Sequence, residues 1–562
     1  MMIGLDVGGT HTDVVLLGQE GLVRQVKVQT HMEDLFSSVL SGLDQITDGL
    51  DPNQIRRIVL STTLTTNAVI QRQTPPVGMI VTGGPGLDTA FFRTNEHYYR
   101  IDGSIDHRGR EIEALDLDRA DEIGEELERL GIRHLGIVGK FSVRNPQHEI
   151  KLFRRLERRF EKIFLGHLCA GMLNFPRRIA TTYINASVYP IYRKFFNAVR
   201  HSLHEKGFTI PIEILKADGG TMRLSTSLDF PAQTILSGPA ASTMGVLAIT
   251  SHTEEIIAVD IGGTTSDIGV ILNGSPVLEP VGISIASHKT LIRALETSSI
   301  GLGGDSWVRV ENGRLQIGPD RKGPASAFGG TVATPTDALH VVGIMTIGDI
   351  GKARQAISKI AVEYGKSESE TAEDILDLTC NILIDAIYAL IDRINSKPVY
   401  TVHELLEEHR IHPQKIVLIG GPAHYMATAL KNRNASFQIE VGNRHQILNA
   451  IGAAIARTTC EVSLFADTQM GTLSAPEENF YQSVDTSFAL DDALSCAISL
   501  LEKKAQLIGT KSESMGVDVL EKSQFNIVRD FHTAGKMYRI RVQVTPGLWN
   551  DYSSFLENKA IE

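Results

Sequence analysis

The hydrophobic positions of the chain fall into short apolar runs, and two pairs of these runs flank a similar glycine turn. Residues 2–5 and 14–17 are apolar on either side of the first turn. Residues 256–259 and 268–272 repeat the layout on either side of the second turn. Two apolar runs joined by a short glycine-containing turn are typical of a β-hairpin. The pattern therefore predicts two matching hairpins, far apart in the sequence.

The two turns also match in their polar residues. They read Asp6-Val7-Gly8-Gly9-Thr10-His11-Thr12-Asp13 and Asp260-Ile261-Gly262-Gly263-Thr264-Thr265-Ser266-Asp267. Asp, Gly, Gly, Thr and Asp recur at the same positions. Because the turns and the flanking runs match together, a duplicated domain is a better explanation than a chance repeat.

Between and after the hairpins, apolar runs alternate with amphipathic stretches. The runs predict strands over 135–138, 212–215 and 416–419. The amphipathic stretches predict helices over 148–163, 179–206, 352–363, 369–395 and 446–458. Alternation of this kind is typical of α/β layers.

The character of the chain changes near residue 465. A helix near 490–508 and strands near 525–529 and 537–545 predict a small α+β domain at the C-terminal end. We therefore expect three parts, over 1–190, 191–465 and 466–562.

Bulk composition fits a globular protein of several domains. The 562 residues are too many for one hydrophobic core, which usually serves roughly 100–200 residues. The net charge of −11 argues against a nucleic-acid surface, which needs a basic footprint. No uncharged apolar stretch reaches the ~18 residues of a membrane span. The four cysteines are widely spaced, and no signal peptide is expected, so we expect a cytoplasmic protein.

The glycine turns predict a site for phosphate groups. Glycines allow a phosphate to approach the backbone N–H groups, and hydroxyl side chains can donate hydrogen bonds to phosphate oxygens. The residues expected to hold phosphates are Gly8, Gly9, Thr10, Thr12, Gly262, Gly263, Thr264, Thr265 and Ser266. An ordinary strand turn is the alternative for either copy alone, and the duplication makes it less favoured.

The carboxylates beside the turns predict a site for Mg²⁺, which usually takes only one or two protein carboxylates. Asp6 and Asp260 end the first strand of each hairpin and are the expected magnesium ligands. Asp13, Asp267 or Asp218 is expected to orient the nucleophile. Asp218 follows the predicted strand over 212–215, and a structural role for it is an equal alternative.

A third glycine pair lies further along the chain. Gly420 and Gly421 follow the predicted strand over 416–419 and precede Pro422. Glycines at this place allow the backbone to lie flat against a base or ribose. Their position after two phosphate turns predicts that they contact adenosine, although a simple turn is the alternative.

This order of two phosphate hairpins and a Gly-Gly loop resembles the actin, sugar-kinase and heat-shock-chaperone ATPase superfamily. That resemblance implies two ribonuclease-H-like lobes with ATP in the cleft. A closer resemblance is carried by further segments in the same order, namely 61–68, 218–220, 236–240, 301–306 and 336–338. This series is similar to the hydantoinase/oxoprolinase family, in its ATP-binding A-type subunit.

The family resemblance implies a reaction. It implies that ATP and Mg²⁺ serve to open a cyclic amide, of the 5-oxoproline or hydantoin type, by phosphorylation of the amide oxygen. Gly303 and Gly304, in one matching segment, are assigned to the cofactor site. The resemblance also implies an oligomer and a B-type partner subunit. A small-molecule kinase, a ketone carboxylase subunit and a non-catalytic actin-like ATPase or activator are the alternatives.

The chain departs from the family pattern at several places, and Leu60-Ser61 stand where the family usually has His-Gly. Ser298 stands where the family usually has His, Asp305 where it usually has Gly, and Asp218 where it usually has Asn. These departures leave the small-molecule substrate open.

Overall fold

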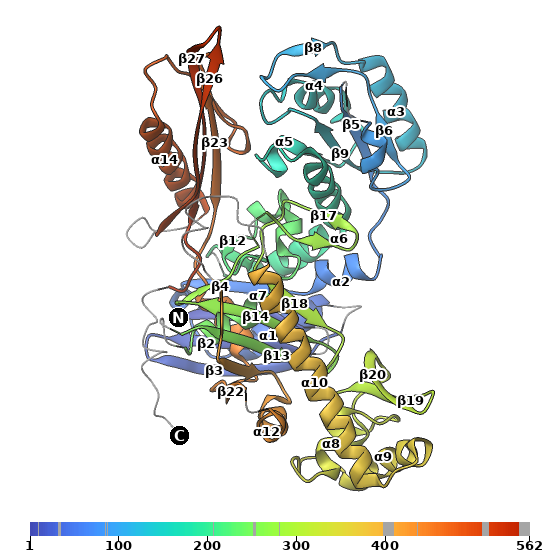
Figure 1. The fold of residues 1–562 in the computed structure, drawn as a ribbon. Coiled ribbons are helices and arrows are strands. Elements are labelled where there is room, and N and C mark those ends of the chain that lie inside the picture. Colours follow the sequence, from blue (N-terminus) through green and yellow to red (C-terminus); the bar gives the residue numbers. More distant parts are fainter. Residues whose placement is uncertain are drawn as a thin grey trace.

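The fold was analysed in a computed structural model of the chain. It describes residues 1–549 except for 9–10, 32–34, 85, 87, 206, 209, 251–253, 280, 397–409, 435 and 509–515. The fold is α/β, with two large sheets at the centre of the molecule (Figure 1).

The first central sheet has the strand order β12-β11-β4-β1-β2-β3. Its strands are β1 (Met2–Val7), β2 (His11–Gly18), β3 (Gly21–Gln29), β4 (Arg57–Thr62), β11 (Ile212–Leu215) and β12 (Thr221–Arg223). β1 pairs antiparallel with β2 and parallel with β4, so the first predicted hairpin is confirmed. β11 and β12, which follow the expected boundary at residue 190, complete this first sheet.

The second central sheet has the strand order β15-β14-β13-β21-β22, and β18 also pairs with β14. Its strands are β13 (Ile256–Ile261), β14 (Ser266–Leu272), β15 (Ser275–Pro276), β18 (Thr297–Ile300), β21 (Lys415–Ile419) and β22 (Gln438–Val441). β13 pairs antiparallel with β14 and parallel with β21. The second predicted hairpin is therefore confirmed, and it lies beside parallel strands as the first one does.

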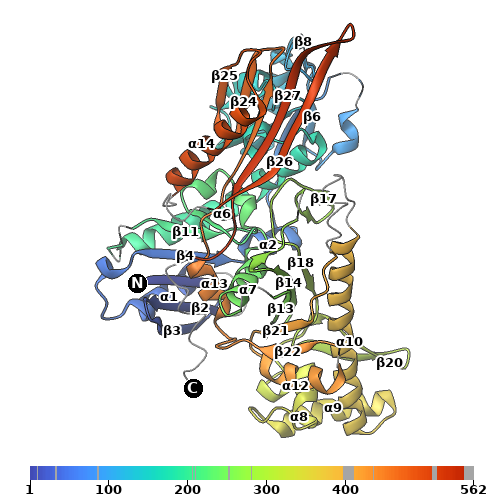
Figure 2. The ribbon, with the colours of Figure 1, turned by 60° about the vertical axis from the view of Figure 1, so that its left-hand side comes forward.

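Two helices of small residues lie between the central sheets (Figure 2). They are α7 (Ser237–Leu247) and α13 (Leu448–Ile455), and their buried side chains share one core with β1, β2, β13 and β14. The helices cross at Gly245 and Gly452. A Cβ at Gly452 would lie 2.3 Å from the Gly245 backbone nitrogen, so the crossing requires glycine.

A smaller parallel sheet is inserted after the first hairpin and β4. It consists of β5 (Gly78–Thr82), β6 (Tyr98–Arg100), β9 (His134–Gly139) and β10 (Lys162–Leu165). The helices α3 (Leu117–Arg129), α4 (Gln147–Leu156) and α5 (Gly166–Cys169) belong to it, and α6 (Phe175–Glu205) returns to the first central sheet. The prediction of a helix over 148–163 is wrong at its end. The helix stops at Leu156, because 162–165 pairs with β9 in a buried strand.

A second insertion separates β18 from β21. It contains β19 (Ser306–Glu311), β20 (Arg314–Arg321), α8 (Pro335–Val341), α9 (Ile350–Tyr364) and α10 (Glu368–Asn395). The predicted helices over 352–363 and 369–395 are confirmed as α9 and α10. α10 is the long helix beside the second central sheet in Figure 1. α12 (Ala423–Arg433) follows β21.

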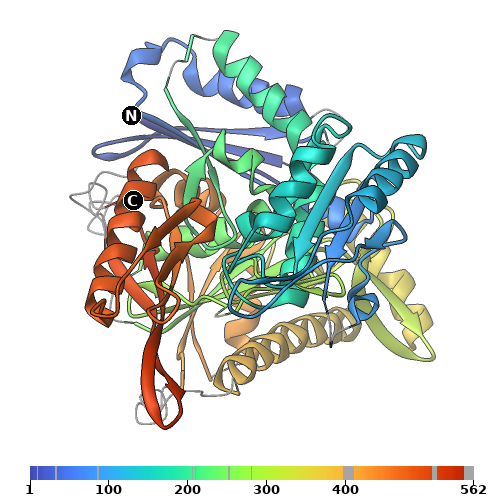
Figure 3. The same cartoon turned by 90° about the horizontal axis from the view of Figure 1, so that it is seen from above.

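The C-terminal region is a five-stranded antiparallel sheet covered by one helix. The strands are β23 (Glu461–Asp467), β24 (Thr472–Ala475), β25 (Phe480–Ser483), β26 (Val517–Arg529) and β27 (His532–Val544), and the helix is α14 (Leu490–Ile508). The helix matches its prediction, and the last two strands begin earlier than predicted. Seen from above, this sheet lies beside the inserted sheet (Figure 3), and Arg108 donates to Gln469 across the contact at 2.6 Å. Within the part that the structure describes, no helix is long and apolar enough to cross a membrane.

Candidate functional site

The two hairpin turns share their backbone geometry. The Gly8 N–H donates to the His11 carbonyl at 3.1 Å, and the Gly262 N–H donates to the Thr265 carbonyl at 2.9 Å. The carboxylates occupy equivalent places as well, because Asp6 pairs with Asp13 and Asp260 pairs with Asp267 in the two ladders. The duplication seen in sequence is thus also a structural one. Gly9 and Thr10 lie outside the described residues.

The four aspartates of the hairpins converge between the sheets, and we call them the carboxylate cluster. Asn449, in the first turn of α13, joins the two hairpins. Its Nδ2 lies 3.3 Å from Asp6 Oδ2 and 3.1 Å from Asp260 Oδ2. Asp260 also accepts from the Ser242 hydroxyl of α7 at 2.6 Å. The helices between the sheets therefore bring the two copies of the motif together.

Burial and mutual repulsion perturb the carboxylate cluster. Burial and, to a smaller degree, the charges of Asp13 and Asp260 raise the pKa of Asp6 to about 6, against the opposing effect of Ser61 and Asn449. Burial raises the pKa of Asp267 to about 7, with a further contribution from Asp260 and Asp6. Burial also raises the pKa of Asp13, although Lys27 lies 2.8 Å away and opposes the shift. The cluster therefore favours a cation or a proton.

The negative charge of the carboxylate cluster suits a divalent cation. Asp6 Oδ1 is buried and makes no hydrogen bond of good geometry among the described residues, although the Ser61 hydroxyl lies near enough to lower the pKa of Asp6. Buried polar atoms are usually satisfied, so an orphaned carboxylate oxygen fits a missing ion or water. No group of three or more His, Cys, Asp or Glu side chains with metal-site geometry occurs among the residues that the structure describes. An ion held by one or two carboxylates and several waters, as Mg²⁺ prefers, is compatible with this arrangement.

The loop around Gly303 and Gly304 lies against the second turn. The Gly304 and Asp305 N–H groups donate to the Gly262 and Gly263 carbonyls at 2.9 and 2.8 Å. A Cβ at Gly303 would lie 2.5 Å from the Gly263 carbonyl carbon, so the approach requires glycine. The predicted phosphate turn and the 303–304 segment therefore form one surface.

Two of the departures from the family pattern can now be located. Asp305 accepts from Arg321 at 2.8 Å and from the Ala325 N–H at 3.1 Å, so it holds the local loops together. Ser298 pairs with Ile268 in the sheet. The next residue, Ser299, donates its hydroxyl to Asp267 of the carboxylate cluster.

The third glycine pair lies against the cluster. Gly420 has a φ of +97°, and a Cβ there would lie 2.3 Å from the Ile261 carbonyl oxygen and 2.6 Å from Asp260 Oδ1. Its carbonyl is 2.7 Å from His445 Nδ1. At Gly421, in contrast, no atom of the described residues other than its chain neighbours lies within 4 Å of the position that a Cβ would take. The Gly420 turn is thus closed toward Asp260 and open at Gly421.

The hydroxyls of the two turns divide into two groups. Thr12 is fully buried with its hydroxyl 2.9 Å from the Thr30 hydroxyl, and Ser266 donates to the Leu302 carbonyl at 2.7 Å. Thr264 is half-buried and Thr265 is exposed. Thr12 and Ser266 therefore stabilise the hairpins, whereas Thr264 and Thr265 lie at the open side of the second turn.

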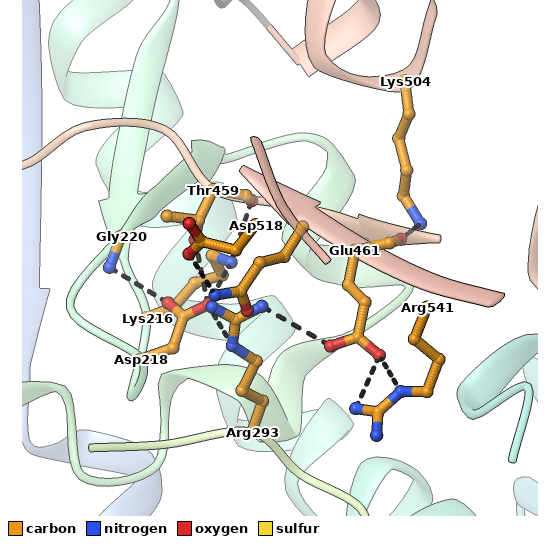
Figure 4. A network of polar contacts seen from close by, with 10 residues as sticks. Lys216, Asp218, Gly220, Arg293, Thr459, Glu461, Lys504, Asp518 and Arg541 are labelled. Carbon is orange, nitrogen blue, oxygen red and sulfur yellow. Dashed lines mark hydrogen bonds and ion pairs between the residues drawn. The ribbon is translucent and has the colours of Figure 1, made fainter. Parts of the chain in front are cut away.

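Asp218 does not join the carboxylate cluster. It lies in the turn from β11 to β12, two to three strands from β1, which corresponds to roughly 10–15 Å at the usual strand spacing. It accepts from Lys216 and Gly220 at 3.0 Å and from Thr459 at 2.9 Å (Figure 4). Burial opposes its ionisation, but Lys216 and Arg293 outweigh burial and lower its pKa to about 2. Asp218 therefore carries a permanent charge in a separate ionic network.

Four residues of the cluster region were not singled out from the sequence. They are Lys27, Ser242, Ser299 and Asn449. Asn449 lies in the predicted helix over 446–458, but a single Asn in a helix has no pattern that distinguishes it. Its contacts with both hairpins are evident only from its position in the fold.

Comparison with known proteins shows which family the sequence matches. Residues 178–462 match the hydantoinase/oxoprolinase family, and residues 2–160 match the hydantoinase/oxoprolinase N-terminal region. Caprolactamase subunit alpha of Pseudomonas jessenii is 24% identical over 95% of this chain and 83% of its own length. The acetophenone carboxylase gamma subunit of Aromatoleum aromaticum is 24% identical over 75% of this chain, which covers 64% of that relative.

The fold is similar to that of a solved structure. The ATP-dependent caprolactamase from Pseudomonas jessenii superposes with a TM-score of 0.72 and 19% identity, over 98% of this chain and 88% of the other. At this level of identity the likeness concerns the fold. The two family matches together cover most of the sequence. The chain belongs to the hydantoinase/oxoprolinase family.

Proposed function

We propose that the two central sheets are the ribonuclease-H-like lobes of an actin-like ATPase, and that ATP binds between them. The observation that carries this proposal is the convergence of both hairpins and the Gly420 turn on the carboxylate cluster. In this proposal the first lobe is centred on 1–190, the second on 191–465, and the C-terminal sheet forms a third part.

The proposal gives the turn residues specific tasks. The turns at 8–12 and 262–266, together with the adjacent loop of Gly303 and Gly304, hold the β- and γ-phosphates. The N–H groups of Gly8, Gly262 and Gly304 already donate within the protein, so the phosphates would meet the other N–H groups of the turns and the hydroxyls of Thr264 and Thr265. Gly421 offers an open backbone surface for adenosine, since no atom of the described residues other than its chain neighbours lies within 4 Å of its Cβ position. Positioning and charge neutralisation of this kind account for most of the protein's contribution to phosphoryl transfer.

Asp6 and Asp260 are the proposed magnesium ligands. Asn449 holds both carboxylates, and Asp6 Oδ1 is the buried oxygen that makes no hydrogen bond of good geometry among the described residues. When bound, Mg²⁺ would offset negative charge on the phosphate oxygens. The two aspartates come from different hairpins, so this site requires that the two lobes stay together.

The reaction we propose is the ATP-dependent opening of a cyclic amide. Amide resonance, which also gives the C–N bond a rotation barrier of about 18–20 kcal/mol, makes the carbonyl carbon a poor electrophile. Transfer of the γ-phosphoryl group to the amide oxygen removes that resonance. Water then adds to the carbon and the C–N bond breaks, which leaves an amine and an acyl phosphate. A second water converts the acyl phosphate into a carboxylate and free phosphate.

Asp267 is the best supported of the three carboxylates that were expected to orient the nucleophile. It lies in the cluster, and burial raises its pKa to about 7, near the pH at which a general base works best. Asp13 is paired with Lys27, and Asp218 is held in its own network. We therefore propose Asp267 as the base that accepts a proton from water.

Two relatives guide the choice of substrate and partner. One is named as a subunit of caprolactamase, which favours a lactam or hydantoin substrate and a B-type partner subunit. The other is named as a subunit of acetophenone carboxylase, which favours an ATP-dependent ketone carboxylase as the second candidate. Both names contain the word subunit, so we propose that this chain also works within a larger complex.

The proposed site predicts a large loss of ATP turnover in Asp260→Ala. Loss of one preorganised electrostatic contact typically costs about 10²–10³ in rate. Phosphate release should be measured with and without 5-oxoproline, hydantoin and ketones, and Asp118→Ala, an exposed aspartate of α3, is the matched control. Near-normal turnover in a folded Asp260→Ala protein would contradict the assignment.

The same assay separates the candidate reactions. Stimulation by a lactam or hydantoin with release of free phosphate supports the amidohydrolase. Stimulation by a ketone only in the presence of bicarbonate supports the carboxylase. Phosphate found on the small molecule would identify a kinase, and slow hydrolysis that no compound changes would identify an actin-like sensor or activator.

A further inference from the structure

A cavity of about 320 Å³ lies outside the carboxylate cluster, where three parts of the chain meet. The turn from β11 to β12 contributes Lys216 and Asp218, and the segment before β18 contributes Arg293. The C-terminal region contributes Glu461 and Gln543, among others. The volume is at the lower end of the range usual for small-molecule sites, about 300–1,000 Å³.

Arg293 lies between two carboxylates in ion pairs, but two of its nitrogens make no hydrogen bond among the described residues. Its Nε lies 3.6 Å from Asp218 and its Nη1 lies 3.5 Å from Glu461, which are ion-pair distances (Figure 4). Nε and Nη2 are buried and make no hydrogen bond. These two nitrogens lie on the same edge of the guanidinium group, and this edge binds a carboxylate through two parallel hydrogen bonds.

Other cations of the cavity wall are already engaged. Lys216 donates to Asp218 and to the Thr459 carbonyl, both at 3.0 Å. Arg541 contacts Glu461 through Nε and Nη2, both at 2.9 Å. Since Lys216 and Arg541 share in compensating the charges of Asp218 and Glu461, Arg293 keeps part of its attraction for an anion at Nε and Nη2.

The cavity also contains acceptors for a donor group. Gln543 Oε1 is buried and has no hydrogen-bond partner, while its amide nitrogen donates to Asp518 at 2.8 Å. Glu477 accepts from the Gly171 N–H, and burial raises the pKa of this carboxyl to about 7. A ligand of this cavity would therefore meet donors at Arg293 and an unpaired acceptor at Gln543 Oε1, with the Glu477 carboxyl also in the wall.

Apolar side chains complete the wall. They are Leu168, Met172, Phe230, Leu278, Val281 and Leu291. A wall of this kind, with few convergent polar groups, is typical of a site for a small organic molecule rather than for an inorganic ion.

We propose that this cavity binds a small amino carboxylic acid, with its carboxylate on Arg293 and its amino group toward Gln543 and Glu477. The proposal stands on the groups of the cavity and goes beyond the nucleotide site. The opening of a cyclic amide would release a compound of this class, so the cavity would be a site for the product.

The segment that carries Arg293 reaches the carboxylate cluster a few residues later. Ser299, in β18, donates its hydroxyl to Asp267. At the far side, α13 carries Asn449 at the carboxylate cluster, and Thr459 follows its end in contact with Asp218. Both connections link the cavity wall to the carboxylate cluster along the chain.

Binding should be measured by calorimetry on the nucleotide-free full chain. The probes are 6-aminohexanoate and glutamate, and hexanoate and hexylamine each lack one of the two groups. We expect saturable binding of at least one amino acid, and weaker or no binding of the single-group compounds. Arg293→Gln should weaken that binding at least 10-fold, and Arg293→Lys, which keeps the charge but not the two-nitrogen edge, should weaken it less.

Three further variants provide an alternative to Arg293→Gln and two controls. Met172→Trp fills the cavity without changing Arg293, so it replaces Arg293→Gln if that variant does not fold. Arg100→Gln, which removes an exposed ion pair with Asp88, should bind as the unchanged protein does. Asp260→Ala should also bind normally, which separates this proposal from the nucleotide site.

Two outcomes would overturn the proposal. One is the absence of saturable binding by either amino acid at millimolar concentration, which would mean that water alone fills the cavity. The other is binding that remains unchanged in folded Arg293→Gln and Met172→Trp proteins.

Discussion

Gly420 and Gly421 are neighbours in the sequence, but an added methyl group would meet different surroundings at the two positions. At Gly420 it would collide with Ile261 and Asp260, and the positive φ would add strain. At Gly421 it would enter open space. One glycine is therefore required by the fold, whereas the other can be changed without steric cost in the absence of a ligand.

This contrast predicts a separation of stability from binding. Gly421→Ala should leave the melting temperature unchanged and weaken ATP binding, because its methyl group would occupy the surface proposed for adenosine. Gly420→Ala should lower the melting temperature. Thermal unfolding and nucleotide titration measure the two effects, and normal ATP affinity in Gly421→Ala would exclude the proposed adenosine contact.

The raised pKa of Asp267 predicts a pH dependence of stability. The folded pKa is about 7 and the usual unfolded value is about 3.9. Between these values the folded protein binds more protons than the unfolded chain, so stability falls as the pH rises through this window. Asp267→Asn removes this titration, and its stability relative to the unchanged protein should grow from pH 5 to pH 8.

The expected gain in the relative stability of Asp267→Asn follows from the size of the pKa shift of Asp267. One pKa unit corresponds to about 1.4 kcal/mol, so a gain on the order of a few kcal/mol is expected at pH 8. Denaturant unfolding at both pH values measures it, with the exposed Asp118→Asn as control. A difference between variant and unchanged protein that is the same at both pH values would contradict the assigned cause.

At the scale of elements, the crossing of α7 and α13 joins the two halves of the molecule. α7 contributes Ser242 and α13 contributes Asn449 to the carboxylate cluster, and the helices pack directly on each other at Gly245 and Gly452. Rigid helices in such close contact fix the distance between the two hairpins. The small residues of these helices thus serve the site as well as the core.

Gly452→Ala should disturb this crossing. Its methyl group would lie 2.3 Å from the Gly245 nitrogen and 2.5 Å from the Ala241 carbonyl oxygen, and neither backbone atom can move alone. Overpacking of this kind typically costs about 1–3 kcal/mol. Gly351→Ala in the exposed first turn of α9 is the control, where only Asp349 Oδ1 approaches, at 3.2 Å. Equal unfolding free energies for the two variants would show that the crossing tolerates a wider spacing.

At the scale of the whole molecule, the central sheets share one core through α7 and α13. A ligand that contacts both hairpins contributes to the stability of both lobes. Saturation with a ligand at 100 times its Kd stabilises the folded state by about 2.7 kcal/mol.

We therefore expect ATP with Mg²⁺ to raise the melting temperature of the whole chain in one transition. Thermal unfolding with ATP, with ATP and EDTA, and with neither measures the effect. Asp260→Ala should lose most of the shift. If only one of two separate transitions moved, ATP would bind to one lobe and not between two.

The sequence predicted the local elements because their causes are local. The apolar runs at 2–5 and 256–259, and the glycine turns beside them, specify hairpins through hydrophobic alternation and turn conformation. The helices α9, α10 and α14 could be predicted as well, because their hydrophobic periodicity extends over many residues. The duplicated turn therefore determined the two hairpins, whereas the family resemblance also required the further segments that lie in order along the chain.

Assembly of the site depended on contacts that are distant in sequence. Asp218 was expected from its place at a strand end to orient the nucleophile as Asp267 could, yet the strand order places it near the sheet edge, in an ionic network with Lys216. The position of Asn449 between Asp6 and Asp260 has no local signal, because it arises from the packing of α13 between two sheets. The sequence by itself determined which local elements form, whereas only the tertiary structure decided which carboxylates meet, since side chains from distant strands are brought together by packing rather than by local preference.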